Sequence, residues 1–314
     1  MKKPLVILTG PTAVGKTELS IQLAKTINGE IISADSMQVY KEMDIGTAKI
    51  LPEEMQGVPH YLVDEFLPDE EFNVVKFKEC ANRYIEEIYA KGKIPILVGG
   101  TGFYIQAVLK DVSFEENEED STYRKELEKL AEEKGALYLH QKLSEVDEES
   151  SKAIHPNNIR RVIRALEFYH QTGMKISEHN AREKERQSPY TYAYFVLTND
   201  RKVLYQRIDK RVDKMIEDGL VEEVRRLKEK GYSRNLVSMQ GLGYKEIYAY
   251  LDGELSLPEA VNILKRDTRH FAKRQLTWFR REQDVTWVDK SELASEKALL
   301  DFCCGVLRKR GIYH

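Results

Sequence analysis

The sequence predicts an α/β fold, a P-loop NTPase-like parallel sheet with helices on both faces, together with an inserted all-helical domain. Apolar strands and amphipathic helices alternate through the first hundred residues, and a glycine-rich turn joins the first strand to the first helix. The pattern then becomes helical throughout before strands return. We expect a discontinuous catalytic core, a helical insertion and a C-terminal tail, at residues 1–115 with 191–290, 116–190 and 291–314.

The first hundred residues supply most of the sheet. Strands are expected at 4–9, 30–34, 60–63 and 94–98, and helices from about residue 16 and over about 73–90. Residues that bind ligands collect at the carboxyl ends of parallel strands. We therefore expect the site to form from three loops, which begin at Gly10, Asp35 and Gly99.

The insertion begins after an acidic stretch, Glu115–Asp120. Helices are expected at Ser121–Lys134, which stops at Gly135, and at Asn157–Gln171, which stops near Gly173. A strand at 192–197 resumes the core. We expect one long amphipathic helix to follow, with an apolar stripe of Leu204, Ile208, Val212, Met215, Leu220 and Val224.

Composition narrows the class of protein. With 314 residues, 41% of them hydrophobic, and a net charge of −3, the chain predicts an ordinary core and no general polycation. No apolar run approaches the roughly 20 residues that span a bilayer, so we expect a cytoplasmic protein with no membrane partner. The cysteines and histidines show no zinc-binding spacing, which argues against a structural metal.

The strongest motif is the G-x-x-x-x-G-K-T sequence at residues 10–17, between the expected strand and helix. Its backbone N–H groups, the charge of Lys16 and the Thr17 hydroxyl, a Mg²⁺ ligand, predict a diphosphate site. The residues expected to hold the diphosphate are Gly10, Pro11, Thr12, Ala13, Val14, Gly15, Lys16 and Thr17. The helix N-terminus points at the same anion.

The acid that usually helps hold Mg²⁺ in nucleotide-hydrolysing P-loop proteins is missing from the strand at 94–98, which runs into Gly99. This absence favours a reaction in which the protein binds a diphosphate group and the diphosphate departs as the leaving group. Asp35 follows another core strand and could act as a general base. Equally, it could only cap its own turn.

Basic residues suggest where further anions bind. Arg207 and Arg211 share one helix face and could close over phosphate, although the interleaved acids also fit a solvated face. The helix that starts near Ser256 has the capping-box spacing with Glu259, an apolar stripe and a basic stripe. The basic stripe, which would follow a phosphate backbone, consists of Arg266, Arg269, Lys273 and Arg280.

Several sequence strings occur together along most of the chain. They are GPTAVGKT at 10–17, DSMQVY at 35–40, MDIGTAK at 43–49, VGGT at 98–101, HPN at 155–157, RALE at 164–167, GY at 243–244 and KRQLTWFR at 273–280. In combination they resemble the bacterial tRNA dimethylallyltransferase family, also known as IPP transferases. The likeness runs from about residue 5 to 288.

The resemblance implies transfer of a dimethylallyl group from dimethylallyl diphosphate to the exocyclic amine of the adenosine 3′ to the tRNA anticodon. It implies that the P-loop holds the donor's diphosphate with Mg²⁺ and that Asp35 is the base beside Thr101. The implied catalytic residues are Asp35, Lys16, Thr17 and Thr101. The adenosine must leave its stack to reach them.

The resemblance also implies an interface with the anticodon stem-loop. Its expected residues are Asp35, Ser36, Met37, Gln38, Thr101, Arg124, Arg160, Arg161, Arg164, Lys273, Arg274, Gln275, Trp278 and Arg280. No protein partner is implied. Two alternatives stay open, a P-loop small-molecule or nucleoside kinase and a non-catalytic RNA-binding module.

Overall fold

The computed structural model describes residues 2–114 and 121–313, which form two compact units. The core unit lies within residues 1–109 and 189–314, and the helical unit within 110–188. The acidic stretch Glu115–Asp120 lies outside the described residues. No helix of the described chain is long and apolar enough to cross a membrane.

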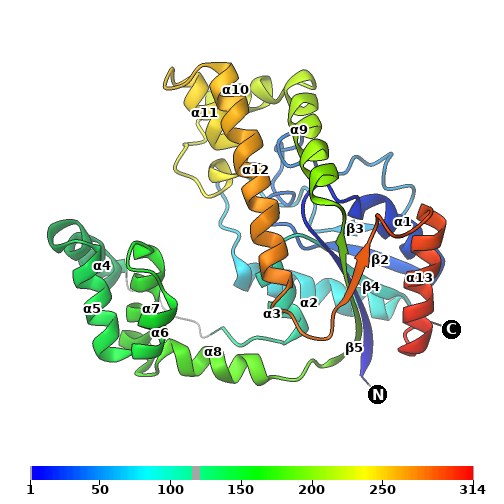
Figure 1. Ribbon diagram of the computed structural model, residues 1–314, viewed down its shortest axis with the longest axis horizontal. Helices are drawn as coiled ribbons and strands as arrows, with labels where there is room; N and C mark the ends of the chain where they lie inside the picture. The colour runs from blue at the N-terminus through cyan, green and yellow to red at the C-terminus, as the bar shows by residue number, and fades with distance from the viewer. Residues whose placement is uncertain (1, 115–120, 314) are drawn as a thin grey trace. The chain divides into compact units, whose positions relative to one another are not determined.

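The core unit contains the predicted parallel sheet (Figure 1). Its strands pair in the order β3-β2-β4-β1-β5-β6, and every pairing is parallel. The bounds are β1 (Lys3–Thr9), β2 (Gly29–Ser33), β3 (His60–Tyr61), β4 (Ile94–Gly99), β5 (Tyr190–Thr198) and β6 (Thr286–Asp289). Strand β4 therefore separates the strand before the P-loop from the strand before Asp35.

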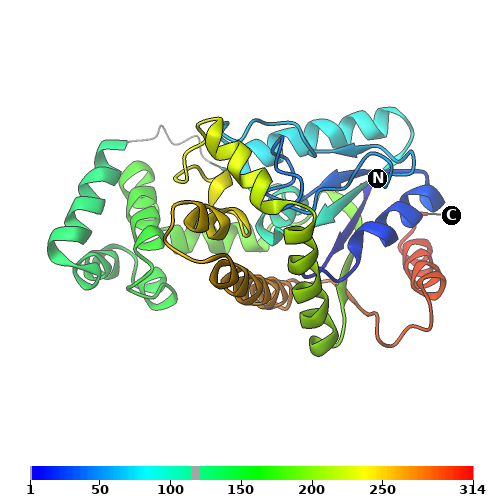
Figure 2. The same cartoon turned by 90° about the horizontal axis from the view of Figure 1, so that it is seen from above.

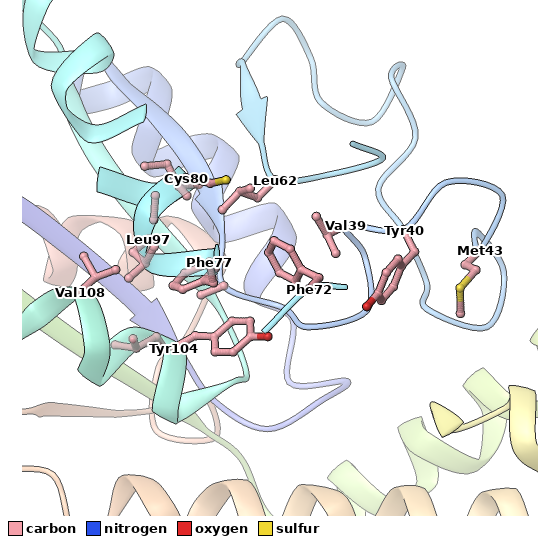
Figure 3. Packing of buried hydrophobic residues seen from close by; sticks show 14 of the residues in the cluster. Val39, Tyr40, Met43, Leu62, Phe72, Phe77, Cys80, Leu97, Tyr104 and Val108 are labelled. Atoms are coloured by element: carbon pink, nitrogen blue, oxygen red, sulfur yellow. The ribbon is translucent and has the colours of Figure 1, made fainter. Parts of the chain in front are cut away.

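Helices cover both faces of this sheet, as predicted. Helix α1 (Lys16–Ile27) and helix α13 (Glu296–Lys309) bury Leu23 and Leu307 with the sheet residue Leu8. On the other face, α2 (Val74–Ala90) and α3 (Gly102–Leu109) stack Phe77 on Tyr104, with ring centroids 4.4 Å apart (Figure 3). The residues expected to form a C-terminal tail, 291–314, thus include a helix of the core unit.

The expectation of one long helix after β5 was wrong. The chain forms α9 (Arg201–Glu217) and α10 (Leu220–Glu229), and Gly219 between them has a φ of +101°. Glycine adopts this left-handed conformation without the strain that a side chain causes. The short helices η1 (Ser238–Gln240) and α11 (Tyr244–Leu251) follow. Figure 2 shows these elements in a view turned by 90° from that of Figure 1.

Helix α12 (Leu257–Phe279) begins as predicted at the capping box of Ser256 and Glu259. Its buried residues Leu264 and Phe279 pack into the same cluster as α2 and α3. This helix of 23 residues therefore packs its apolar side into the core.

The helical unit contains α4 (Ser121–Lys134), α5 (Ala136–Val146), α6 (Glu148–Ala153), α7 (Ile159–Thr172) and α8 (Ile176–Glu185). Helix α7 ends at Gly173, whose φ is +68°. Leu139, Leu143 and Val162 form the centre of a separate apolar core, each with no exposed surface. The insertion thus has a core of its own.

Candidate functional site

The P-loop has the conformation that its glycines predict. Gly10 and Gly15 have φ of +147° and +92°, and a Cβ on Gly10 would lie 2.5 Å from the carbonyl oxygen of Leu197. Lys16 Nζ donates to the carbonyl oxygens of Gly10 and Pro11, both at 3.0 Å. The loop is therefore wound around its own lysine, at the N-terminus of α1.

A cavity of about 540 Å³ opens at the carboxyl end of the sheet. The P-loop, the ends of β2 and β4, the loop at 47–48, and helices α9 and α12 line it. The lining residues are Thr12, Ala13, Gly15, Lys16, Thr17, Asp35, Gln38, Thr47, Ala48, Val98, Gly99, Gly100, Arg207, Lys210, Arg211, Lys214, Phe271 and Gln275. The predicted strand ends thus meet at one site.

Cations dominate the lining. They are Lys16, Arg207, Lys210, Arg211 and Lys214, and Asp35 is the single carboxylate among the lining residues described. Arg211 Nη1 lies 3.2 Å from the Thr12 hydroxyl, which ties α9 to the P-loop. The cavity therefore suits a ligand with several negative charges.

Burial changes the acidity of two of these cations. Loss of water lowers the pKa of Lys16 to about 8, with Arg211 adding to the effect and the negative charge of Asp35 opposing it. Burial likewise lowers the pKa of Arg211, again opposed by Asp35. Both cations have lost hydration, and a bound anion would compensate for that loss.

Asp35 caps its own turn and also lines the cavity. Its Oδ1 accepts hydrogen bonds from the backbone N–H groups of Met37 at 2.9 Å and Gln38 at 3.3 Å. Among the described residues, no hydrogen bond ends on Oδ2. The turn therefore fixes the carboxylate through one oxygen, while the residue also lines the cavity.

Gly99 and Gly100, at the end of β4, pack closely against the segments beside them. A Cβ on Gly99 would lie 2.1 Å from the carbonyl oxygen of Ala34, and one on Gly100 would lie 2.1 Å from Gln275 Nε2. Strand β4 lies between β1 and β2, so a larger residue at these positions would collide with the backbone of Ala34 or with the Gln275 side chain. The glycines after β4 are thus required by close packing.

Gln275 of α12 is buried and braces the P-loop. Its Oε1 accepts the N–H of Thr12 at 2.9 Å, and its Nε2 donates to the carbonyl oxygen of Gly100 at 3.0 Å. Both ends of the amide are therefore engaged within the protein. This use differs from the RNA contact expected for Gln275 from the sequence.

Other predicted residues lie around the cavity rather than in its lining. The N–H of Thr101 donates to the Ala34 carbonyl at 3.1 Å, and Met37 packs on Gly241. Ser36 is partly exposed. Trp278 packs on Gly102, and within the described part of the chain its buried Nε1 has no hydrogen-bond partner.

The predicted basic stripe of α12 is partly neutralised. Arg266 pairs with Asp267 at 2.8 Å, and Arg269 pairs with Asp209 of α9. Lys273, Arg274 and Arg280 are exposed. The cations available to an external anion are therefore concentrated in the C-terminal half of the helix.

The helical unit presents a second basic group. Arg160, Arg161 and Arg164 are all exposed on α7. Arg124 of α4 instead forms a bidentate pair with Glu167, with N–O distances of 2.8 and 2.7 Å. Its guanidinium joins two helices of the unit, so a phosphate would have to compete with that carboxylate.

Sequence reasoning missed three parts of the site. Lys210 lies on the same helix face as Arg207, so its spacing could have identified it. The loop at Thr47 and Ala48 carried no physical signal. Glu223 accepts hydrogen bonds from three backbone N–H groups of the loop at 44–46, and its place on the apolar stripe of Leu220, Val224 and Leu227 was a usable sign.

Few of the described side chains near the cavity could bind a metal ion. Among the described residues, no group of three His, Cys, Asp or Glu side chains could hold one. Thr17 lines the cavity at the start of α1, and its residue is exposed. A Mg²⁺ ion bound by the Thr17 hydroxyl and by ligand oxygens fits these residues, since Mg²⁺ commonly keeps few protein ligands.

Comparison with known proteins shows which family the chain belongs to. The sequence model described as IPP transferase matches residues 38–282. A tRNA dimethylallyltransferase from Lachnoclostridium phytofermentans is 67% identical over 310 residues, covering 99% of both chains. One from Acetivibrio thermocellus is 53% identical over 296 residues, covering 94% of this chain and 95% of that protein.

Solved structures agree. A full-length tRNA isopentenylpyrophosphate transferase from Bacillus halodurans has a TM-score of 0.74 and 47% identity, covering 99% of this chain and 98% of that one. A eukaryotic dimethylallyltransferase described as acting on tRNA has a TM-score of 0.78 and 31% identity, covering 96% and 80%.

Proposed function

Because this chain belongs to the IPP transferase family, we propose that it is a tRNA dimethylallyltransferase. It transfers a dimethylallyl group from dimethylallyl diphosphate to the exocyclic amine of the adenosine 3′ to the anticodon, and diphosphate leaves. The observation that carries this proposal is a cavity that sets one carboxylate, Asp35, opposite a P-loop and four further cations.

The cation-rich side of the cavity holds the leaving group. Backbone N–H groups of the P-loop, Lys16 and Arg211 surround the diphosphate, with Arg207 and Lys210 nearer the exposed side of α9. Negative charge grows on the diphosphate as the allylic C–O bond breaks. These fixed cations stabilise that charge most in the transition state.

Asp35 serves the acceptor. The exocyclic amine of adenine is a weak nucleophile because its lone pair is delocalised into the ring. As the new N–C bond forms and the C–O bond breaks, one proton of the amine passes to Asp35 Oδ2, the oxygen that the turn leaves free. Thr101, tied to the residue before Asp35, lies beside this acceptor.

Mg²⁺ fits the site through Thr17, as described above. When bound, it would add positive charge to the diphosphate oxygens. The protein's own residues perform the other steps. The P-loop positions the donor, and Asp35 removes the proton. A location in the cytoplasm, where tRNA is modified, completes this proposal.

Exposed cations bind the RNA. Arg160, Arg161 and Arg164 of the helical unit and Lys273, Arg274 and Arg280 of α12 contact the stem-loop backbone. Flipping the adenosine out costs a few kcal/mol, which these contacts offset. In the described chain Gln275 and Arg124 bind other residues of the protein. We therefore do not include them among the residues that we propose to contact the RNA.

The decisive experiment supplies Mg²⁺, labelled dimethylallyl diphosphate and unmodified tRNA. Label should enter RNA, and Asp35→Ala should abolish most turnover while leaving tRNA binding intact. A kinase with the same P-loop would instead turn over ATP, and a non-catalytic RNA-binding module would bind tRNA without label transfer. Either result would refute the proposal.

A further inference from the structure

Glu223 of α10 is a buried carboxylate with four hydrogen-bond donors converging on it. Its side chain belongs to a residue only 1% exposed. Oε2 accepts the N–H groups of Asp44 and Ile45 at 3.0 and 2.8 Å, and Oε1 accepts that of Gly46 at 3.1 Å. The Tyr244 hydroxyl donates to Oε1 at 2.7 Å.

These bonds hold the loop at residues 43–49, here named the acceptor loop. Tyr244 remains a donor because burial and the charge of Glu223 raise its pKa well above the usual value. Its ring also packs against the loop, since a Cβ on Gly46 would lie 2.6 Å from Tyr244 Cε2. Glu223 thus holds the loop through hydrogen bonds to a charged group, and the Tyr244 ring holds it through close packing.

The other end of the acceptor loop reaches the cavity. The carbonyl oxygens of Thr47 and Ala48 accept from Gln38 Nε2 at 3.3 and 3.1 Å, which sets the orientation of that amide. Gln38 in turn donates its backbone N–H to Asp35 Oδ1. A chain of hydrogen bonds therefore runs from Glu223 through the loop and Gln38 to the carboxylate.

A second anchor limits how far the loop can move. Lys49 Nζ donates to the Tyr40 carbonyl oxygen at 2.7 Å and forms ion pairs with Asp44 and Asp64 at 2.6 and 2.8 Å. These bonds secure the loop at its exposed side. Among the described residues, Glu223 is the acceptor for the backbone N–H groups of Asp44, Ile45 and Gly46, which would otherwise lose this partner.

We propose that Glu223 is a positioning residue of the transfer reaction, which holds the acceptor loop so that Gln38 and Asp35 keep their places on the acceptor side of the cavity. This inference rests on the proposed function. The P-loop side uses other contacts, namely Gln275 and Arg211. Loss of Glu223 should therefore disturb the acceptor while sparing the diphosphate.

The test compares Glu223→Gln with the wild-type protein. The amide is isosteric, but its NH₂ group meets N–H donors in either orientation, so the loop loses part of its anchor. We expect turnover at saturating tRNA and donor to fall at least about tenfold, as loss of buried hydrogen bonds predicts. Inorganic pyrophosphate should bind with unchanged affinity, and amide exchange should speed up at residues 44–46 alone.

Two further variants sharpen this test. Gly46→Ala disturbs the loop from its own side, through the Tyr244 ring, and should reproduce the same pattern. Glu222→Gln is the matched control, because Glu222 is exposed and pairs with Arg225 on the same helix. It should behave as wild type.

The outcomes separate the two proposals. Wild-type turnover in Glu223→Gln would overturn the inference, and so would loss of pyrophosphate binding with faster exchange throughout the core, which would show a merely structural role. A wild-type protein that transfers no label would refute the proposed function instead. The exchange and pyrophosphate measurements would still decide whether Glu223 holds the acceptor loop separately from the P-loop.

Discussion

At the scale of single residues, Asp35 links local geometry to chemistry through its two oxygens. Oδ1 is occupied by the turn, so Oδ2 is the oxygen that we propose as the proton acceptor. Asp35→Asn keeps the turn bonds but removes the base, and should lower turnover by about 10²- to 10⁴-fold. Single-turnover transfer with labelled donor measures this loss. The exposed Asp301→Asn on α13 is the control, and equal rates in the two variants would contradict the assignment.

Lys16 gives a prediction about pH. Its pKa is lowered to about 8 by burial, so the free protein carries the charged lysine below pH 8 and loses it above. We expect kcat/KM for dimethylallyl diphosphate to fall as pH rises through 8, because the neutral amine binds the anion poorly. Measured profiles should lose this step in Lys16→Met. A flat wild-type profile up to pH 9 would show that another group controls binding.

At the scale of elements, α12 stabilises the site through one buried amide. Gln275→Ala leaves the Thr12 N–H and the Gly100 carbonyl without their partner and should lower the free energy of unfolding by about 1–3 kcal/mol. Urea denaturation measures this change. Lys273→Ala, on the exposed side of the same helix, should stay within about 0.5 kcal/mol. Equal losses in both would show that the two hydrogen bonds of the buried amide are not the cause.

Elements with local signals were predictable. The P-loop and the start of α12 follow from glycine and capping residues close together in sequence, and both were confirmed. The break at Gly219 was missed because a glycine within a continuous apolar stripe does not by itself end a helix. The apolar stripe of α10 indicated that Glu223 is buried, but the hydrogen-bond partners of Gln275 and Glu223 could not be predicted. These partners lie up to 263 residues away in the chain, so only the fold brings them together.

At the scale of the whole molecule, charge is divided between two units that each have their own core. The net charge of −3 hides this division, since cations line the cavity of the core unit and others lie exposed on α7. In the proposed reaction the diphosphate therefore depends partly on Lys16 and Arg211, which are less exposed than the other cavity cations, and salt screens their charge less. RNA binding depends on exposed ones, which salt screens strongly.

This division predicts a variant that affects RNA alone. Replacing Arg160, Arg161 and Arg164 with alanine should weaken tRNA binding and reduce the slope of log Kd against log salt by about 2, since each phosphate contact contributes about 0.7 to 0.9. Turnover at saturating tRNA and affinity for pyrophosphate should not change. Filter binding from low to high salt measures the slope.

The matched control for this variant removes two lysines of the same unit, Lys129 and Lys152. Each already pairs with an acid on its own helix, at 3.7 and 2.9 Å, so its charge is balanced and its loss should leave the slope unchanged. An unchanged slope in the arginine variant would show that α7 does not contact the RNA backbone. The exposed cations of α12 would then have to supply the electrostatic attraction by themselves, and replacing Lys273, Arg274 and Arg280 together with alanine would remove most of the salt dependence.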